Sequence, residues 1–261
     1  MLQKNKYSVV INAGGLGTRL SSEYNGLPKA LVPVFDDPII IDQINKFVTQ
    51  GFKEFVILLG HKAQEIKQSL ETYYSHSKIK IKFLIESERL GSGGSLLHFL
   101  HDLPQNFIFT YCDILFDLNV INMVQFHEDV RADMTVFVHP NDHPYDSDLV
   151  LVESNGLVSA IKPHPHSFDD YTGNLVNAAF YVVNKTCLSQ IDYNGRAMDF
   201  AQNVIPDILS NSIVYAYQTP EFLKDMGTPS RLSKARNIYE NRFRDDGNNK
   251  VICFDRDGTL N

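Results

Sequence analysis

Short apolar runs alternate with longer amphipathic stretches through the first half of the chain. Runs rich in β-branched and aromatic residues predict strands over residues 7–11, 55–59, 79–84, 107–111 and 134–138. The stretches between them predict helices over residues 39–50, 62–74, 94–101 and 120–129. Such alternation implies parallel strand pairing through right-handed crossovers, with helices on both faces of the sheet. The expected fold class is α/β, a Rossmann-like mixed sheet that is mainly parallel.

The pattern changes after residue 148. Runs over residues 149–152 and 157–161 flank the dipeptide Asn155-Gly156, which is typical of hairpins, and a longer strand is expected over 174–183. We expect a small antiparallel insertion that extends the sheet and covers the cleft, followed by helices over 197–209 and 229–239. Residues 1–240 are therefore expected to form one domain, and the polar segment 241–250 a linker.

Composition narrows the class of protein. A hydrophobic content of 43% with 21% charged residues is ordinary for a globular domain, and the net charge of −7 argues against nucleic acid or an anionic membrane as a partner. No apolar run approaches the ~20 residues that a membrane-spanning helix needs. Cys112, Cys187 and Cys253 are widely spaced, which favours reduced thiols in a cytoplasm. The sequence leaves the oligomeric state open.

A glycine-rich segment follows the first predicted strand. Residues 12–20 read N-A-G-G-L-G-T-R-L, and residues 27–34 read L-P-K-A-L-V-P-V. Gly14, Gly15 and Gly17 let backbone N–H groups approach a phosphate chain, because no Cβ stands in the way. Arg19 and Lys29 add two cations. The glycine spacing fits neither the Walker P-loop nor the dinucleotide motif, and an ordinary tight turn is the alternative interpretation.

This combination resembles the signature of the sugar-phosphate nucleotidyltransferases, which join a sugar 1-phosphate to a nucleotide and release pyrophosphate. The resemblance covers residues 8 to about 235. It implies catalytic roles for three residues: Arg19 along the triphosphate, Lys29 between the α-phosphate and the incoming sugar phosphate, and Asp113. It also implies nucleotide binding by a larger set, namely Ala13, Gly14, Gly15, Gly17, Thr18, Glu86, Gly91 and Ser92.

Two aspartates resemble the pair by which this family holds Mg²⁺. Asp113 follows the predicted strand 107–111, and Asp225 lies in D-M-G-T-P, residues 225–229. Mg²⁺ prefers one or two carboxylates together with phosphate oxygens, which suits this pair. Asp113 alone would fit a turn or a helix cap equally well, and Cys112 replaces the glycine that usually precedes it. The expected cofactor is Mg²⁺, held by Asp113 and Asp225.

Glu86 opens a segment, E-S-E-R-L-G-S-G-G, that resembles the base and ribose loop of the family. A carboxylate accepts two parallel hydrogen bonds from guanine N1–H and N2–H₂, whereas uracil and thymine each offer one such donor. Glu86 therefore favours GTP, although a solvated loop glutamate is the plain alternative. Gly91 would let the backbone reach the base.

The sugar subsite is the least typical part of the resemblance. Lys162 resembles the lysine that faces the sugar phosphate, Asn177 resembles the asparagine that binds sugar hydroxyls, and Gly173 offers a close backbone contact. Two positions depart from the family pattern: Ile161 replaces the usual glutamate, and Ala179 replaces the usual glycine. Four histidines flank prolines nearby, and loop histidines near a sugar pocket are favoured over a zinc site; they are His139, His143, His164 and His166.

Residues 251–261, V-I-C-F-D-R-D-G-T-L-N, resemble the first motif of the haloacid dehalogenase phosphatases. There Asp255 would be the nucleophile and Asp257 the general acid/base, so we expect 251–261 to open a second, truncated phosphatase domain of a bifunctional protein. Fusions of this kind resemble the enzymes that make GDP-D-glycero-D-manno-heptose.

The expected reaction is transfer of GMP from GTP to D-glycero-D-manno-heptose 1-phosphate, with release of pyrophosphate. Alternatives are a mannose or hexose 1-phosphate guanylyl-, uridylyl- or thymidylyltransferase, or a nucleotide-sugar sensor without catalysis.

Overall fold

The computed structural model describes residues 6–140, 147–166 and 173–243. Its centre is a nine-stranded sheet whose main path runs β10-β6-β9-β4-β1-β2-β3. The bounds are β1 Ser8–Asn12, β2 Glu54–Leu59, β3 Lys80–Ile85, β4 Asn106–Tyr111, β6 Met134–Pro140, β9 Leu175–Asn184 and β10 Val214–Gln218. β4, β1, β2 and β3 pair in parallel, as do β10 and β6, whereas β9 is antiparallel to both β4 and β6. The predicted mainly parallel α/β fold is confirmed.

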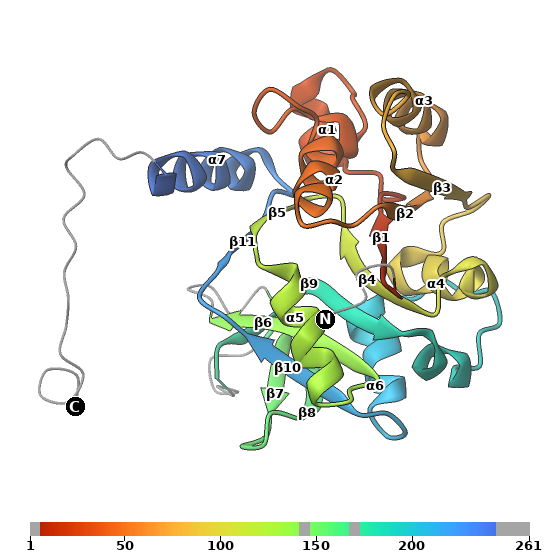
Figure 1. The fold of residues 1–261 in the computed structure, drawn as a ribbon, viewed down its shortest axis with the longest axis vertical. Helices are drawn as coiled ribbons and strands as arrows, with labels where there is room; N and C mark the ends of the chain where they lie inside the picture. The colour runs from red at the N-terminus through yellow and green to blue at the C-terminus, as the bar shows by residue number, and fades with distance from the viewer. Residues whose placement is uncertain (1–5, 141–146, 167–172, 244–261) are drawn as a thin grey trace, which may run out of the picture.

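Helices cover both faces of the sheet because neighbouring residues of each strand point in opposite directions. Val9 and Ile11 of β1 belong to one apolar cluster, and Val10 between them belongs to another. The first cluster is closed by α2 (Ile39–Thr49), α3 (Ala63–Tyr73) and α5 (Val120–Asp129). The second is closed by α4 (Gly91–His98), the π-helical turn η7 (Phe200–Val204) and α6 (Ile205–Ile208). Figure 1 shows these helices distributed around the sheet.

The antiparallel part is more deeply embedded than the sequence suggests. β7 (Leu149–Val152) and β8 (Val158–Lys162) form the predicted hairpin, and β7 touches β9 through the pair Leu149 and Val176. β9 itself is inserted between β4 and β6 and is almost entirely buried. Only the β7–β8 hairpin therefore extends the sheet, whereas β9 is part of its centre.

Several elements differ from the sequence-based expectation. α4 begins at Gly91 instead of residue 94, and the predicted helix over 197–209 is a π-helical turn followed by the short α6. The strands β5 (Ile114–Asp117), β10 and β11 (Phe222–Asp225) were not predicted from the sequence. The last helix, α7 (Pro229–Phe243), runs into the expected linker. The phosphatase-like segment 251–261 lies outside the described residues.

A second, two-stranded sheet lies beside the main one. β5 and β11 pair antiparallel, and their register places Asp225 opposite Ile114. α7 follows β11 directly and stands at the edge of the body (Figure 1). A third apolar cluster lies between these elements and the segments that follow the glycine loop; it contains Leu20, Val32, Val34, Ile39, Leu115, Phe222, Met226, Leu232 and Ala235. The chain segments that carry Arg19, Lys29, Asp113 and Asp225 are thus packed against one small core.

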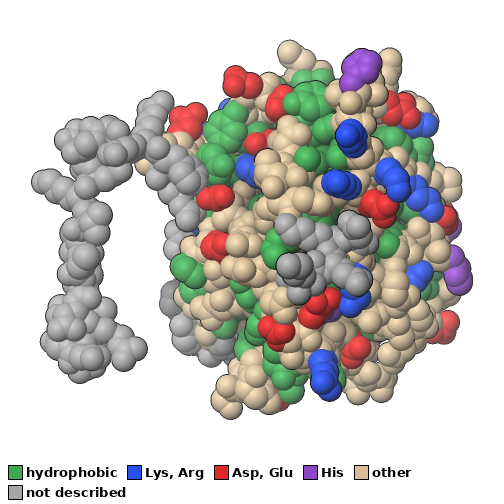
Figure 2. Space-filling view, in the orientation of Figure 1, with side chains coloured by type: hydrophobic (Ala, Val, Ile, Leu, Met, Phe, Trp, Pro, Cys, Tyr) green, Lys and Arg blue, Asp and Glu red, His purple; other side chains and the backbone are tan. Residues whose placement is uncertain are grey.

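No helix within the described ranges is both long and apolar enough to cross a bilayer. On the face shown in Figure 2, several Lys and Arg side chains lie in the upper right part, with Asp and Glu side chains between them.

Ala179 has a backbone conformation that glycine tolerates better. It lies in a bulge of β9, where Val136 pairs with Tyr181 but Val138 pairs with Asn177, and its φ is +56°. An L-residue in this left-handed region costs about 1 kcal/mol because its Cβ crowds the following carbonyl oxygen. We expect Ala179→Gly to raise the free energy of unfolding by about 1 kcal/mol in urea denaturation.

The neighbouring Ala178→Gly variant is the control for that measurement. Ala178 is buried and lacks the positive φ, so its replacement should lower the free energy of unfolding by roughly 1 kcal/mol. Equal destabilisation by both variants would contradict the strain at Ala179.

His127 makes the stability of the fold sensitive to acid. It is 4% exposed on α5, and its Nδ1 lies 2.9 Å from the Thr135 hydroxyl oxygen. Burial lowers the pKa of His127 from 6.5 to about 4. The unfolded chain therefore binds more protons between pH 6.5 and 4, and the free energy of unfolding should fall by about 3 kcal/mol as the pH decreases through this range.

Urea unfolding of the wild type and of His127→Gln at pH 7, 6 and 5 tests this. In the variant, the free energy of unfolding should depend less on pH, because the contribution of His127 is lost. This holds whatever the stability of the variant at pH 7. Parallel pH profiles for the two proteins would contradict the assignment.

Candidate functional site

The carboxyl ends of the parallel strands are tied together at one edge of the sheet. The amide of Cys112 donates to the carbonyl of Asn12 at 3.0 Å, joining the ends of β4 and β1. The amide of Ala13 donates to Leu58 at 2.8 Å, and that of Glu86 donates to Leu59, also at 2.8 Å. Ligands of such sheets bind at this edge. The glycine loop, Glu86 and Asp113 all follow strands that end at this edge.

The glycine loop packs directly on Lys29. Gly17 has a φ of +56°, and a Cβ built on it would overlap the Cβ of Lys29. Gly17 is therefore required both by its conformation and by this close approach. Gly15 has open space around it, and a Cβ on Gly14 would lie 3.1 Å from Oε1 of Glu86. Thr18 and Arg19 then begin the short helix α1 (Thr18–Ser21).

Lys29, Asp113 and Asp225 meet at one point above Gly227. Lys29 forms an ion pair with Oδ2 of Asp113, and the amide of Gly227 donates to Oδ1 of Asp225. A Cβ built on Gly227 would lie 2.9 Å from Oδ1 of Asp225, 3.2 Å from Nζ of Lys29 and 3.3 Å from Oδ2 of Asp113. The space that a side chain would fill is thus surrounded by two carboxylates and an ammonium group.

The charges at this point influence one another. Partial burial and the Asp113 carboxylate raise the pKa of Asp225. Burial alone would lower the pKa of Lys29, but Asp113 and Asp225 outweigh it and raise the pKa, so Lys29 is a cation at neutral pH. Burial raises the pKa of Cys112 to about 12, which keeps its thiol uncharged. The replacement of the family's glycine by Cys112 therefore adds no charge to the site.

This arrangement fits a small divalent cation. Two carboxylates face a space without a side chain, and burial together with the Asp113 charge raises the pKa of Asp225. Within the described ranges, no group of three or more His, Cys, Asp or Glu side chains could hold a metal. A cation that takes one or two carboxylates and completes its shell with water and phosphate oxygens matches this donor set, as Mg²⁺ does.

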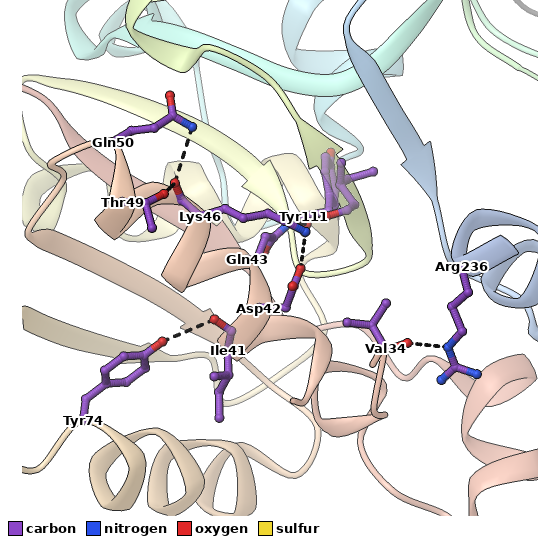
Figure 3. A network of polar contacts seen from close by, with 11 residues as sticks. Val34, Ile41, Asp42, Gln43, Lys46, Thr49, Gln50, Tyr74, Tyr111 and Arg236 are labelled. Atoms are coloured by element: carbon purple, nitrogen blue, oxygen red, sulfur yellow. Dashed lines mark hydrogen bonds and ion pairs between the residues drawn. The ribbon is translucent and has the colours of Figure 1, made fainter. Parts of the chain in front are cut away.

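Two polar side chains missed from the sequence hold the site in place. Gln43 of α2 is 1% exposed and donates from Nε2 to the carbonyls of Tyr111, at 2.8 Å, and Ile114, at 2.9 Å. It fixes the turn that carries Asp113. Arg236 of α7 donates to the carbonyls of Val34 and Pro33 and so ties α7 to the segment after Lys29. Figure 3 shows the contact between Arg236 and Val34, and Gln43 close to Tyr111. A buried glutamine on an amphipathic helix leaves no recognisable signal in the sequence.

A cleft of about 530 Å³ extends from the aspartates along β9 to the β7–β8 hairpin. Arg19 lines it, exposed and without an ion pair to any described residue. Asn177 and Tyr181 of β9 line its far part, and the Asn177 amide donates to the Tyr181 hydroxyl at 2.7 Å. The described lining residues are Arg19, Tyr111, Asp113, Ile114, His139, Ser147, Asp148, His164, Val176, Asn177, Ala178, Ala179, Tyr181, Asp199, Ala201, Leu223, Lys224, Asp225, Arg231, Lys234 and Ala235.

The far end of the cleft is organised around Asp148. Its Oδ1 accepts from the His164 amide at 3.1 Å and from Gln202 Nε2 at 3.0 Å, and lies 2.9 Å from His164 Nδ1. His139 lines the same end, whereas His143 lies outside the described residues. Asn177 is brought to this cleft as expected, but Lys162 and Gly173 are not among its described lining residues.

Glu86 lies beside Gly14 of the glycine loop, whereas Lys29 packs on Gly17. Its Oε2 is buried without a hydrogen-bond partner among the described residues, and burial raises the pKa of its carboxyl group. Gly60, at the end of β2, was not singled out from the sequence; a Cβ there would lie 2.6 Å from Oε1 of Glu86. A glycine directly after a buried parallel strand was the signal available for it.

The glycines at the start of α4 serve chain packing. Gly91 has a φ of +72°, and a Cβ on it would lie 2.5 Å from the Met198 carbonyl oxygen. Ser92 donates from its hydroxyl to Asp199 at 2.9 Å and accepts from the Phe200 amide at 2.9 Å. These contacts explain the glycine and the serine without a ligand, and their roles in nucleotide binding stay predictions.

The chain is similar in sequence to known proteins. The catalytic subunit beta of mannose-1-phosphate guanylyltransferase from Drosophila pseudoobscura pseudoobscura is 25% identical over 243 residues, covering 92% of this chain and 64% of that protein. A probable mannose-1-phosphate guanylyltransferase 3 from Arabidopsis thaliana is 27% identical over 225 residues, covering 84% of this chain and 66% of that protein. The chain thus spans just under two thirds of the length of these relatives.

Solved structures share the fold. HddC from Yersinia pseudotuberculosis has a TM-score of 0.75 at 24% identity, covering 89% of this chain and 99% of that chain. A UDP-glucose pyrophosphorylase complexed with UDP-glucose has a TM-score of 0.73 at 16% identity, covering 90% of this chain and 99% of that chain.

The sequence profile that matches this chain is the one described as Nucleotidyl transferase. It spans residues 8–242 and so includes the glycine loop, Lys29, both aspartates and the start of α7. These are the segments that the third apolar cluster packs together. The chain belongs to the Nucleotidyl transferase family.

Proposed function

We propose that this protein transfers a nucleoside monophosphate from a nucleoside triphosphate to a sugar 1-phosphate and releases pyrophosphate. The observation that supports this best is the space above Gly227, where Lys29, Asp113 and Asp225 converge. The relatives named mannose-1-phosphate guanylyltransferase support the same class of reaction.

The chemistry needs charge neutralisation more than proton transfer. An oxygen of the sugar phosphate attacks the α-phosphorus, and the bond from that phosphorus to the bridging oxygen of pyrophosphate breaks. A phosphate monoester is already anionic at neutral pH, so no general base is required. Lys29 would stabilise the charge that builds up between the two substrates, and Arg19 would lie along the triphosphate. Asp113 and Asp225 would hold Mg²⁺, which supplies positive charge to the phosphate oxygens.

We propose GTP as the nucleotide. Glu86 offers a buried carboxylate oxygen without a partner in the described structure, and guanine supplies two donors in parallel. A structure of HddC was solved in complex with GMP-PN, which agrees with a guanine nucleotide in this fold. Uridylyl and thymidylyl transfer remain the alternatives, since a UDP-glucose pyrophosphorylase shares the fold.

For the sugar we propose D-glycero-D-manno-heptose 1-phosphate. The support is the phosphatase-like motif of residues 251–261, because a phosphatase that removes a second phosphate from a heptose bisphosphate would supply this substrate. We accordingly propose residues 1–240 as the transferase domain, 241–250 as a linker and 251–261 as the first motif of a phosphatase domain. Mannose 1-phosphate is the alternative that the curated relatives favour.

Pyrophosphate release tests the reaction. The protein should be assayed with GTP, UTP, dTTP, CTP and ATP against heptose, mannose and glucose 1-phosphates, with Mg²⁺. We expect turnover with GTP and its loss in Asp225→Ala. Turnover with UTP or dTTP instead would overturn the guanine assignment, whereas nucleotide binding without turnover for any pair would identify a sensor.

A further inference from the structure

Each of the two aspartates at the proposed metal site already has a cation from the chain itself. Lys29 pairs with Asp113, and Nη1 of Arg231 lies 2.8 Å from Oδ2 of Asp225. Arg231 lies in the first turn of α7, where the Thr228 hydroxyl accepts from the Arg231 amide at 3.2 Å and caps the helix. A divalent ion must therefore compete with side chains that are already in place.

The two ion pairs differ in how easily they can be exchanged. The Lys29 and Asp113 side chains are 18% and 15% exposed, whereas the Arg231 and Asp225 side chains are 38% and 43% exposed. Exposed ion pairs contribute little to stability, because water screens the attraction between their charges. The pair of Asp225 with Arg231 is thus the more exposed of the two, and a divalent ion would displace Arg231 more readily than Lys29.

Arg231 also lines the cleft that contains Asn177 and Tyr181. Lys162, which the sequence suggested for the sugar phosphate, is not among the described residues that line it. Arg231 and Lys234 of α7 do line the cleft. A guanidinium group can bind two phosphate oxygens at once. Arg231 is thus a cation of the cleft lining that an ion pair also places at the proposed metal site.

We propose that Arg231 binds the phosphate of the incoming sugar substrate and is held on Asp225 until a divalent ion takes over that carboxylate. This rests on the proposed function. Metal binding would then release the guanidinium group into the cleft, so metal and sugar phosphate bind cooperatively. Arg231 would keep the empty site neutral and prevent the sugar phosphate from occupying the cleft before the metal.

Metal binding alone gives the first test. Mn²⁺ titrated into nucleotide-free protein, followed by electron paramagnetic resonance, should bind Arg231→Met about fivefold more tightly than the wild type, since a competing charge is lost. Lys82→Met is the matched control: Lys82 pairs with Asp102 at 2.7 Å in an ion pair that is also exposed but is not part of the cleft lining, and its loss should change Mn²⁺ affinity by less than about twofold. Weaker Mn²⁺ binding in Arg231→Met would overturn the proposal, because it would show that Arg231 only supports Asp225.

Calorimetry with mannose 1-phosphate gives the second test, since it shares the manno configuration and anomeric phosphate of the proposed substrate. In the wild type and in Lys82→Met, saturating Mg²⁺ should tighten its binding at least fivefold, whereas Arg231→Met should show no such enhancement and Arg231→Lys a partial one. Absence of enhancement in the wild type, or its persistence in Arg231→Met, would overturn the proposal. The Mn²⁺ titration does not depend on turnover, so a failure of the proposed function would be recognised separately.

Discussion

Replacing Lys29 with methionine should lower kcat for pyrophosphate release by about 10³-fold, as expected when a preorganised charge is removed from a phosphoryl-transfer site. Lys29 is paired with Asp113, and the absence of a Cβ on Gly17 leaves the space that the Lys29 side chain occupies. The ammonium group therefore has a fixed position from which it can meet charge that develops in the transition state. Nucleotide affinity should change much less than kcat, because that charge is absent before the reaction.

Lys46→Met is the matched control for this measurement. Lys46 pairs with Asp42 at 2.6 Å and its side chain is 18% exposed, as is that of Lys29, but both partners lie on α2. The control should retain kcat within about twofold, since it removes the same charge away from the cleft. Unfolding midpoints of both variants show whether lost activity reflects lost structure. If Lys29→Met retained most of its kcat, the proposed role of Lys29 would be wrong.

Gly227→Ala should reduce turnover by about 100-fold with little change in secondary structure. The added Cβ would lie 2.9 Å from Oδ1 of Asp225 and close to Lys29 and Asp113, in the space where the metal and substrate phosphates are proposed to meet. Asp225 must then turn away, because the backbone of Gly227 is fixed between β11 and the cap of α7. The stabilisation that Mg²⁺ gives to the wild-type unfolding midpoint should also be lost.

Ser233→Ala, a substitution of similar size on the exposed surface of α7, is the control. It should keep both the turnover and the Mg²⁺ response of the wild type. A Gly227→Ala protein that binds Mg²⁺ normally would show that the space above Gly227 is not the metal site.

The strands and helices with strong periodicity were predictable, and so was the grouping of charged residues. β1 to β4 follow the predicted runs closely, because β1, β2 and β4 are mainly apolar segments and β3 begins with an alternation of lysine and apolar residues. Asp113 and the glycine loop were expected at one edge because carboxyl ends of parallel strands meet there, and the structure places them so. The short strands β5 and β11 were missed, although they set the distance between the two aspartates.

The sequence by itself determined the α/β class, and it predicted phosphate binding by the glycine loop and a divalent ion at the two carboxylates, because these depend on periodicity and local residue type. Only the tertiary structure decided that β9 lies inside the sheet, that Gln43 holds the turn before Asp113, and that Arg231 is the partner of Asp225. Each of these depends on contacts between residues far apart in the chain, and such contacts leave no local pattern. The cleft exists because packing, and not spacing along the sequence, brings α7 against β11.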